Sequence, residues 1–133
     1  KTIKKVFAHA QYDGLCRGYI SEKQAPLSMD KNVLSLKPLI GDGMMQVMTY
    51  VPNQKHPMMS QIQLQSGEIG EDIAYYLNQS QQIPCLISLA VKIGSEGKVT
   101  AAGGVLIELM PGHTEETLKK IEKHQCLLFL FLL

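Results

Sequence analysis

The sequence of 133 residues has no excess of charge of either sign. Lysine and arginine number 13 against 12 aspartate and glutamate residues, which gives a formal net charge of +1. Binding of nucleic acid through phosphate contacts requires a basic surface, so this balance predicts no nucleic-acid partner. With 45% hydrophobic and 19% charged residues, the composition is that of a globular domain rather than of a disordered chain.

A long apolar segment is also absent. A membrane-spanning helix needs roughly 20 apolar residues, whereas the run at 126–133 is far shorter. We therefore expect no membrane partner. Residues 1–124 are interpreted as a partial domain, and residues 125–133 as an apolar tail left by truncation or by the end of the sequence. A buried final strand is the alternative for this tail.

Cysteines are few and scattered. The sequence has no C-x-C or C-x-x-C motif, because its cysteines are Cys16, Cys85 and Cys126. The chain alone therefore predicts neither a zinc site nor a local redox pair. His113, His124 and Cys126 are too few for structural zinc, which takes four ligands. We expect no metal and no cofactor in this chain. Scattered thiols are typical of a reducing compartment, which favours the cytoplasm.

No catalytic constellation is visible either. There is no G-x-S-x-G segment, and Gly41-x-Gly43 lacks the third glycine of a phosphate-binding loop. Cys85 could act as a nucleophile beside a histidine, but a buried structural cysteine is the simpler interpretation. Gly103 and Gly104 are interpreted as marking a bulge or a close backbone approach within a strand. The sequence predicts no enzyme.

Periodicity and turn residues predict an α+β fold with largely antiparallel sheets and inserted helices. Short turns such as Asp13-Gly14 join consecutive strands, as in hairpins. Residues 22–38 are polar with two prolines and are expected to form a loop. The expected strands cover residues 3–10, 16–21, 44–51, 58–65, 87–93 and 99–109, and the expected helices cover 67–80 and 115–124.

The first expected helix carries a group of acidic residues at its start. Ser66 is a suitable N-cap, because its hydroxyl can accept a free amide of the first turn. Glu68, Glu71 and Asp72 are then interpreted as stabilising the positive end of the helix dipole, rather than as acid–base groups.

Methionine is the residue type most suggestive of function. Five of the seven methionines fall on two neighbouring expected strands, where pairing would gather some of them on one face. Methionine is flexible and polarizable, and it is used on surfaces that bind diverse partners. Ordinary filling of the core is the alternative. The candidate apolar binding surface comprises Met44, Met45, Met48, Met58 and Met59.

Three separated blocks carry a family resemblance. SGEIGEDIAYYL at 66–77, SQQIP at 80–84 and AAGGVLIELMPG at 101–112 resemble, in order and spacing, segments of the 33 kDa chaperonin family. We call the residues that mark this resemblance the fingerprint residues and expect them to be structural. They are Ser66, Gly67, Glu68, Glu71, Asp72, Tyr76, Gln82, Pro84, Gly103, Gly104, Met110 and Pro111.

The resemblance implies a function in binding rather than in catalysis. Members of that family are ATP-independent heat-shock holdases that bind unfolded or partly folded proteins in the stress response. Their core domain forms a homodimer when oxidised. A following zinc domain carries four cysteines, and disulfide formation there releases zinc and activates the chaperone. The implied location is the cytoplasm, or an organelle for a eukaryotic protein.

The chain departs from this family pattern in its cysteines. Cys16, Cys85 and Cys126 match none of the zinc ligands, so no ligand is carried over and zinc is expected only in the missing C-terminal domain. The alternative function is a structural or interaction module that kept the scaffold but lost the redox switch. A hydrolase using Cys85 is a further alternative.

Overall fold

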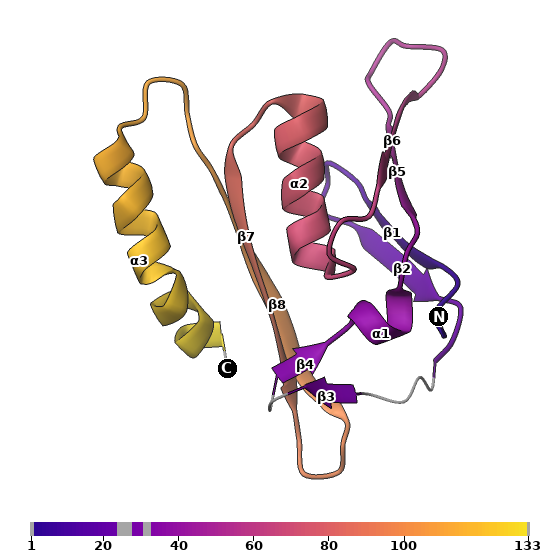
Figure 1. The fold of residues 1–133 in the computed structure, drawn as a ribbon. Helices are drawn as coiled ribbons and strands as arrows, with labels where there is room; N and C mark the ends of the chain where they lie inside the picture. Colours follow the sequence, from indigo (N-terminus) through magenta and orange to yellow (C-terminus); the bar gives the residue numbers. More distant parts are fainter. Residues whose placement is uncertain (1, 24–27, 31–32, 133) are drawn as a thin grey trace. The chain divides into compact units, whose positions relative to one another are not determined.

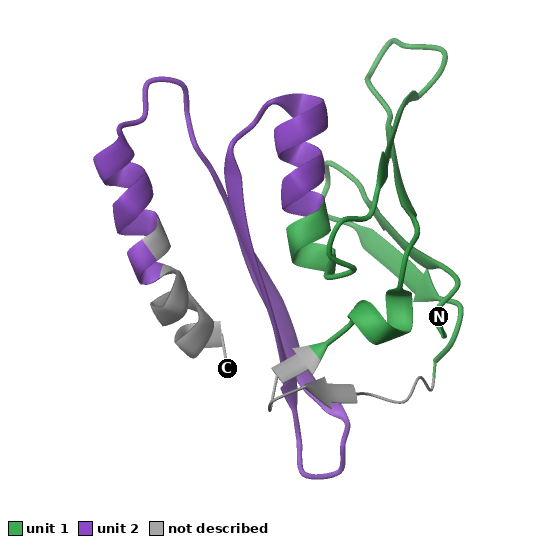
Figure 2. Ribbon diagram, viewed as in Figure 1, with its two compact units in different colours: residues 1–72 green, residues 73–133 purple. Residues whose placement is uncertain are grey.

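The computed structural model of the chain describes residues 2–23, 28–30 and 33–132. They belong to two compact units, Lys1–Asp72 and Ile73–Leu133 (Figure 2). The predicted α+β class is confirmed, because every sheet within the described ranges is a two-stranded antiparallel pair. The elements (Figure 1) are β1 (Val6–Ala10), β2 (Cys16–Ile20), β3 (Ser28–Asp30), β4 (Val33–Ser35), α1 (Lys37–Ile40), β5 (Met44–Thr49), β6 (Met58–Gln63), α2 (Ile69–Gln81), β7 (Cys85–Ile93), β8 (Val99–Glu108) and α3 (Glu115–Leu132).

The first unit begins with the hairpin β1–β2, as its turn residues predict. Gly14 has a φ of 87°, a conformation that costs glycine little. The Asp13 Oδ1 atom accepts the amide of Leu15 at 3.1 Å, and the Gly14 amide donates to the Gln11 carbonyl at 3.0 Å. These bonds close the turn and set the antiparallel register of the two strands.

The prediction of a loop over 22–38 is wrong for part of that segment. The strands β3 and β4 pair with each other, and the short helix α1 follows them. Pro38 lies in the first turn of α1, where its missing amide costs nothing. Strands of three residues are too short for a period of two to be recognised. Residues 24–27 and 31–32 of the predicted loop lie outside the described residues.

The small core of the first unit joins its beginning to α1. Ile3 and Leu39 are buried, with 5% and 4% of their surfaces exposed. The amides of Thr2 and Ile3 both donate to the Leu39 carbonyl at 3.0 Å. Apolar burial and backbone hydrogen bonds therefore both hold residues 2–3 against α1.

The second unit is organised on the long hairpin β7–β8. Helix α3 packs against both strands of the hairpin. The register shifts between Lys92 and Ile93, which places the irregularity near the turn rather than at Gly103 and Gly104. The bulge interpretation of these glycines is therefore wrong. The alternative, close approach, holds at Gly104, where a Cβ atom would lie 3.0 Å from the Ser88 carbonyl oxygen and 2.5 Å from Leu89 Cδ2.

Helix α3 is longer than predicted. The sequence predicts it over 115–124, but it continues to Leu132 and includes most of the apolar tail. The alternative of a buried final strand is therefore wrong. An uninterrupted apolar run has neither the period of a strand nor that of a helix, so its sequence alone did not identify it. None of the helices within the described residues is long and apolar enough to cross a membrane.

Candidate functional site

The hairpin β5–β6 exposes three methionines on one face. Met48 pairs directly with Met59, and Met44 lies four residues before Met48, so period-two alternation puts all three on the same side. Their exposed fractions are 62% for Met44, 49% for Met48 and 59% for Met59. We call these three residues the methionine face.

The two other candidate methionines lie on the opposite face. Met45 pairs with Ile62 and is half-buried, whereas Met58 pairs with Thr49 near the end of the hairpin and is 53% exposed. Pairing gathers three of the five side chains on one face and leaves two on the other. Because four of the five are exposed, filling of the core describes only Met45.

The methionine face lies in a segment without carboxylates. Residues 44–65 contain no aspartate or glutamate, and Lys55 is their one permanent cation. Glutamines separate the methionines, and the Gln61 Nε2 atom donates to the Met44 sulfur at 3.0 Å. This surface offers flexible apolar side chains and neutral hydrogen-bonding groups, which suits apolar chain segments without selecting them by charge.

Asp72 has a role beyond the one predicted. It is 3% exposed and lies in the first turn of α2, where it closes the preceding loop. Its Oδ1 atom accepts the amides of Gln65 at 2.8 Å and Ser66 at 3.0 Å, and its Oδ2 atom accepts that of Gly67 at 3.0 Å. These three charge-assisted hydrogen bonds hold the loop at residues 65–67 against the start of α2. They act in addition to any interaction of the carboxylate with the helix dipole.

Glu68 also acts through specific hydrogen bonds. Its Oε1 atom accepts the Ser35 hydroxyl at 2.6 Å and the amides of Leu36 at 2.9 Å and Lys37 at 3.3 Å. These groups lie at the beginning of α1, whose free amides it therefore satisfies. Glu71 is exposed in the first turn of α2, a position that fits the predicted interaction with the dipole.

The prediction of Ser66 as the N-cap of α2 is wrong. The Glu68 carbonyl accepts the Asp72 amide at 3.0 Å, which makes Glu68 the residue that begins the helical bonding. The Ser66 hydroxyl accepts the Glu68 amide at 3.0 Å, so it bonds to the residue that precedes the helix rather than to an amide of the first turn. Gly67 between them has a φ of 77°, and a Cβ atom there would lie 3.2 Å from Lys37 Cα. The loop is therefore folded tightly onto the start of α1.

The remaining fingerprint residues lie in the second unit. Tyr76 is buried and its hydroxyl accepts Gln81 Nε2 at 3.1 Å. Gln82 has a φ of 55° just after the end of α2. The Pro84 carbonyl accepts the Leu109 amide at 2.9 Å, which joins the ends of the hairpin. Met110 is exposed, and Pro111 follows it in the turn before α3.

Cys85 lacks the environment of an activated nucleophile. Burial raises the pKa of its thiol, and the carboxylate of Glu108, its cross-strand neighbour, raises it further. Its sulfur lies 3.9 Å from the Ala74 carbonyl oxygen, and in the described part of the chain it has no hydrogen bond to a histidine. The thiolate is the reactive form, so this arrangement disfavours the hydrolase alternative.

The described residues offer no metal centre. Nowhere among them do three or more histidine, cysteine, aspartate or glutamate side chains gather around a common point. Cys16 is exposed on β2 and Cys85 is half-buried on β7. The side chain of Cys126 lies outside the described residues, so the arrangement of His113, His124 and Cys126 stays untested.

Comparison with known proteins agrees with this fold. Two 33 kDa chaperonins are similar to the chain: that of Thermoanaerobacter sp. (strain X514) is 35% identical over 123 residues, and that of Carboxydothermus hydrogenoformans is 39% identical over 120. The alignments cover 91% and 90% of this chain and 42% of each relative. The chain therefore spans less than half the length of these relatives.

A solved structure and a family model give the same result. The crystal structure of the 33 kDa chaperonin (heat shock protein 33 homolog) from Thermotoga maritima matches with a TM-score of 0.79 and 32% identity. The match covers 92% of this chain and 42% of that one. The family model described as Hsp33 protein matches residues 1–130. The chain belongs to the Hsp33 family.

Proposed function

We propose that this chain is the core part of an ATP-independent holdase chaperone that binds unfolded or partly folded proteins and is not an enzyme. The observation that carries the proposal is the methionine face, with three exposed methionines on one side of β5–β6 in a segment without carboxylates. Flexible side chains adapt to many apolar sequences, as a protein that holds diverse clients requires. Membership of the Hsp33 family supports the same function.

Redox regulation is proposed for the whole protein, not for this segment alone. The family resemblance implies a zinc domain with four cysteines, but the described residues of this chain do not fit a zinc site, because no three ligand groups gather there. Structural zinc needs four ligands held together. We therefore assign no zinc ligand and no disulfide of the switch to these residues. A homodimer under oxidising conditions and a location in the cytoplasm complete the proposal.

Suppression of aggregation is the direct test. A thermally unfolding client protein is heated with the chain, and light scattering is recorded. The chain should suppress scattering, and the double change Met48→Ser and Met59→Ser should weaken suppression several-fold, because it replaces two apolar side chains on the methionine face. Gln54→Ser and Gln79→Ser together form a matched control, since they change exposed polar residues outside the methionine face. Equal suppression by both double variants would contradict the assignment of the surface.

The alternative is an interaction module without the switch. The two are distinguished by treating the protein, extended through its complete reading frame, with peroxide before the assay. A redox-regulated holdase gains suppression and becomes dimeric by analytical ultracentrifugation. A module without the switch shows the same oligomeric state and the same suppression before and after treatment.

A further inference from the structure

The hairpin β1–β2 has two faces of different chemistry. Strand pairing puts Phe7 beside Tyr19 and His9 beside Arg17 on one face. The other face carries only small or apolar residues, namely Val6, Ala8, Ala10, Cys16, Gly18 and Ile20. Polar and aromatic groups are thus concentrated on one side, which we call the cationic face. It comprises Lys5, Phe7, His9, Gln11, Arg17 and Tyr19.

An aromatic stack lies at the centre of the cationic face. The rings of Phe7 and Tyr19 have centroids 5.3 Å apart and planes inclined by 25°. The Lys5 ammonium lies over the Tyr19 ring, 5.5 Å from its centroid. Tyr19 remains 51% exposed, so the stack offers an aromatic surface onto which a further apolar or aromatic side chain can pack.

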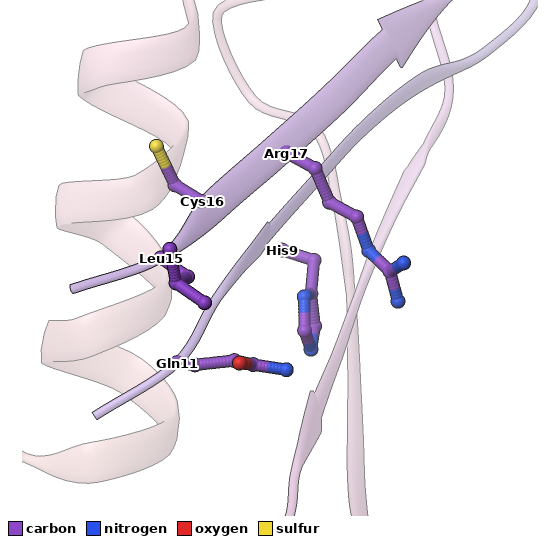
Figure 3. A pocket seen from close by; sticks show the side chains of 5 residues that line it. All are labelled: His9, Gln11, Leu15, Cys16 and Arg17. Carbon is purple, nitrogen blue, oxygen red and sulfur yellow. The ribbon is translucent and has the colours of Figure 1, made fainter. Parts of the chain in front are cut away.

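Arg17 lines a surface cavity next to this stack. The cavity has a volume of about 260 Å³ and is lined by His9, Gln11, Leu15, Cys16 and Arg17. Figure 3 shows the side chains of His9, Gln11 and Arg17 on one side of the hairpin, with the Cys16 sulfur pointing away from them. Within the described residues Arg17 forms no ion pair. Its guanidinium therefore presents free donors in a fork that matches a carboxylate.

No acidic group of the hairpin neutralises this face. Asp13 is the one carboxylate between Lys5 and Ile20, and it lies in the turn, where it accepts the Leu15 amide. Among the residues that the structure describes, neither Lys5 nor Arg17 forms an ion pair, and their backbone positions lie on either side of the stack. A partner with negative charge at both ends and an apolar group between them would complement all three parts of the surface.

We propose that the cationic face is a binding site for an extended acidic polypeptide segment with an aromatic residue between two carboxylates. Lys5 lies opposite Ser21, with the Ser21 amide donating to its carbonyl, and Arg17 lies opposite His9, four residues further along β1. The Cα positions of the two cationic residues are thus separated by about 13 Å along the strand, and the charges reach this spacing when the Lys5 side chain extends away from the Tyr19 ring. In an extended ligand, carboxylates at i and i+4 match this separation, and residue i+2 faces the aromatic stack.

A polypeptide fits this surface better than a nucleic acid. Aromatic stacking alone would serve bases as well as side chains. Nucleic-acid binding depends on many phosphate contacts, however, whereas this face offers two permanent cations and the whole chain has a net charge of +1. The site goes beyond the proposed holdase function, because it contains none of the methionines on which that function rests.

Fluorescence anisotropy with a labelled peptide containing Asp-Gly-Phe-Gly-Asp tests the site on the complete chain. The peptide should bind at least about fivefold more tightly than the version with asparagine in place of both aspartates, and less tightly as salt is added. Replacing its phenylalanine with alanine should also weaken binding. Equal affinity for the acidic and asparagine peptides, or tighter binding of a single-stranded oligonucleotide of equal length, overturns the proposal.

Variants locate the site on the cationic face. Arg17→Gln and Lys5→Gln should each weaken binding about threefold to fivefold, whereas Lys92→Gln, the same charge change at an exposed position of β7, should leave it unchanged. Arg17→Glu should prefer a peptide in which one aspartate is replaced by lysine, which shows that a loss is electrostatic and not a failure to fold. Equal effects of all three glutamine variants would place the binding elsewhere.

Discussion

At the scale of single residues, the best-defined feature of the chain is the Asp72 carboxylate. This buried carboxylate accepts three backbone amides, of which that of Gly67 is buried and those of Gln65 and Ser66 are partly buried. The substitution Asp72→Asn keeps the shape but loses the charge, and one of its two terminal groups becomes a donor facing amide donors. The loop before α2 is therefore expected to depend on the hydrogen bonds that this one carboxylate accepts.

Asp72→Asn should lower the free energy of unfolding by about 2 to 3 kcal/mol, the range for charge-assisted hydrogen bonds. Urea denaturation followed by circular dichroism measures the change. Glu71→Gln is the matched control, because it removes the same charge from the neighbouring, exposed position. We expect it to stay within about 0.5 kcal/mol of the parent. A similar loss of stability in both variants would show that Asp72 acts through its charge near the end of the helix and not through its three hydrogen bonds.

Cys85 gives a prediction that depends on pH. Burial first, and Glu108 second, raise the pKa of its thiol in the folded chain. As pH rises past about 8.5, the ordinary thiol value, the unfolded chain loses this proton before the folded chain does. The contribution to stability is therefore complete at neutral pH and decreases as pH rises through the alkaline range. Glu108→Gln should reduce this alkaline loss, because it removes the carboxylate that disfavours the thiolate.

The same environment determines how fast each thiol reacts. Iodoacetamide should modify the exposed Cys16 several-fold faster than Cys85 near pH 8, because alkylation requires an accessible thiolate. Glu108→Gln should about double the rate at Cys85 and leave the rate at Cys16 unchanged. Peptide mapping by mass spectrometry resolves the two sites. A faster reaction at Cys85 than at Cys16 would instead support the hydrolase alternative.

At the scale of elements, the two strands of the longest hairpin, β7 and β8, approach each other closely at Gly104. A Cβ atom there would collide with the Leu89 side chain and lie close to the Ser88 carbonyl oxygen. This oxygen belongs to the backbone of a paired strand, so it cannot easily move away. Gly104→Ala should therefore lower the free energy of unfolding by about 1 to 3 kcal/mol, as measured in urea.

A double-mutant cycle separates the two causes of this loss. The Leu89 Cδ2 atom is the nearer one, at 2.5 Å, so Leu89→Ala removes the side-chain part of the collision. The double variant should therefore cost less than the sum of the two single changes. Additive losses would show that the backbone contact with Ser88, and not the side chain, makes glycine necessary.

The hairpins β1–β2 and β7–β8 were predictable from sequence, whereas the pair β3–β4 and the contacts that join segments were not. Asp13-Gly14 and the alternation in β7 are local signals of turn and strand. The division of the methionines between two faces also had a local signal, because Met44-Met45 and Met58-Met59 are adjacent pairs, and neighbours in a strand point to opposite sides. The hydrogen bonds that Glu68 accepts from residues 35–37 cross more than thirty positions of sequence, and no period or spacing in the sequence indicates them.

At the scale of the whole molecule, family membership restricts function more than any local motif does. Three blocks in register identified the scaffold from sequence, and the family model over residues 1–130 confirms it. The comparisons do not assign a role to any residue of the chain. The methionine face and the cationic face follow only from strand register, since each side chain's neighbours across the sheet decide what surface it helps to form.

These two faces lie on different sheets, so their functions should be separable. Met48→Ser with Met59→Ser should weaken aggregation suppression and leave affinity for the acidic peptide unchanged. Arg17→Gln should weaken peptide binding about threefold to fivefold and leave suppression of an apolar client unchanged. The physical reason is that the two faces are built from different strand pairs, and sites that share no partner contribute additively. Measuring both activities in both variants tests this directly, and loss of both activities in either variant would mean that the hairpins form a single binding surface.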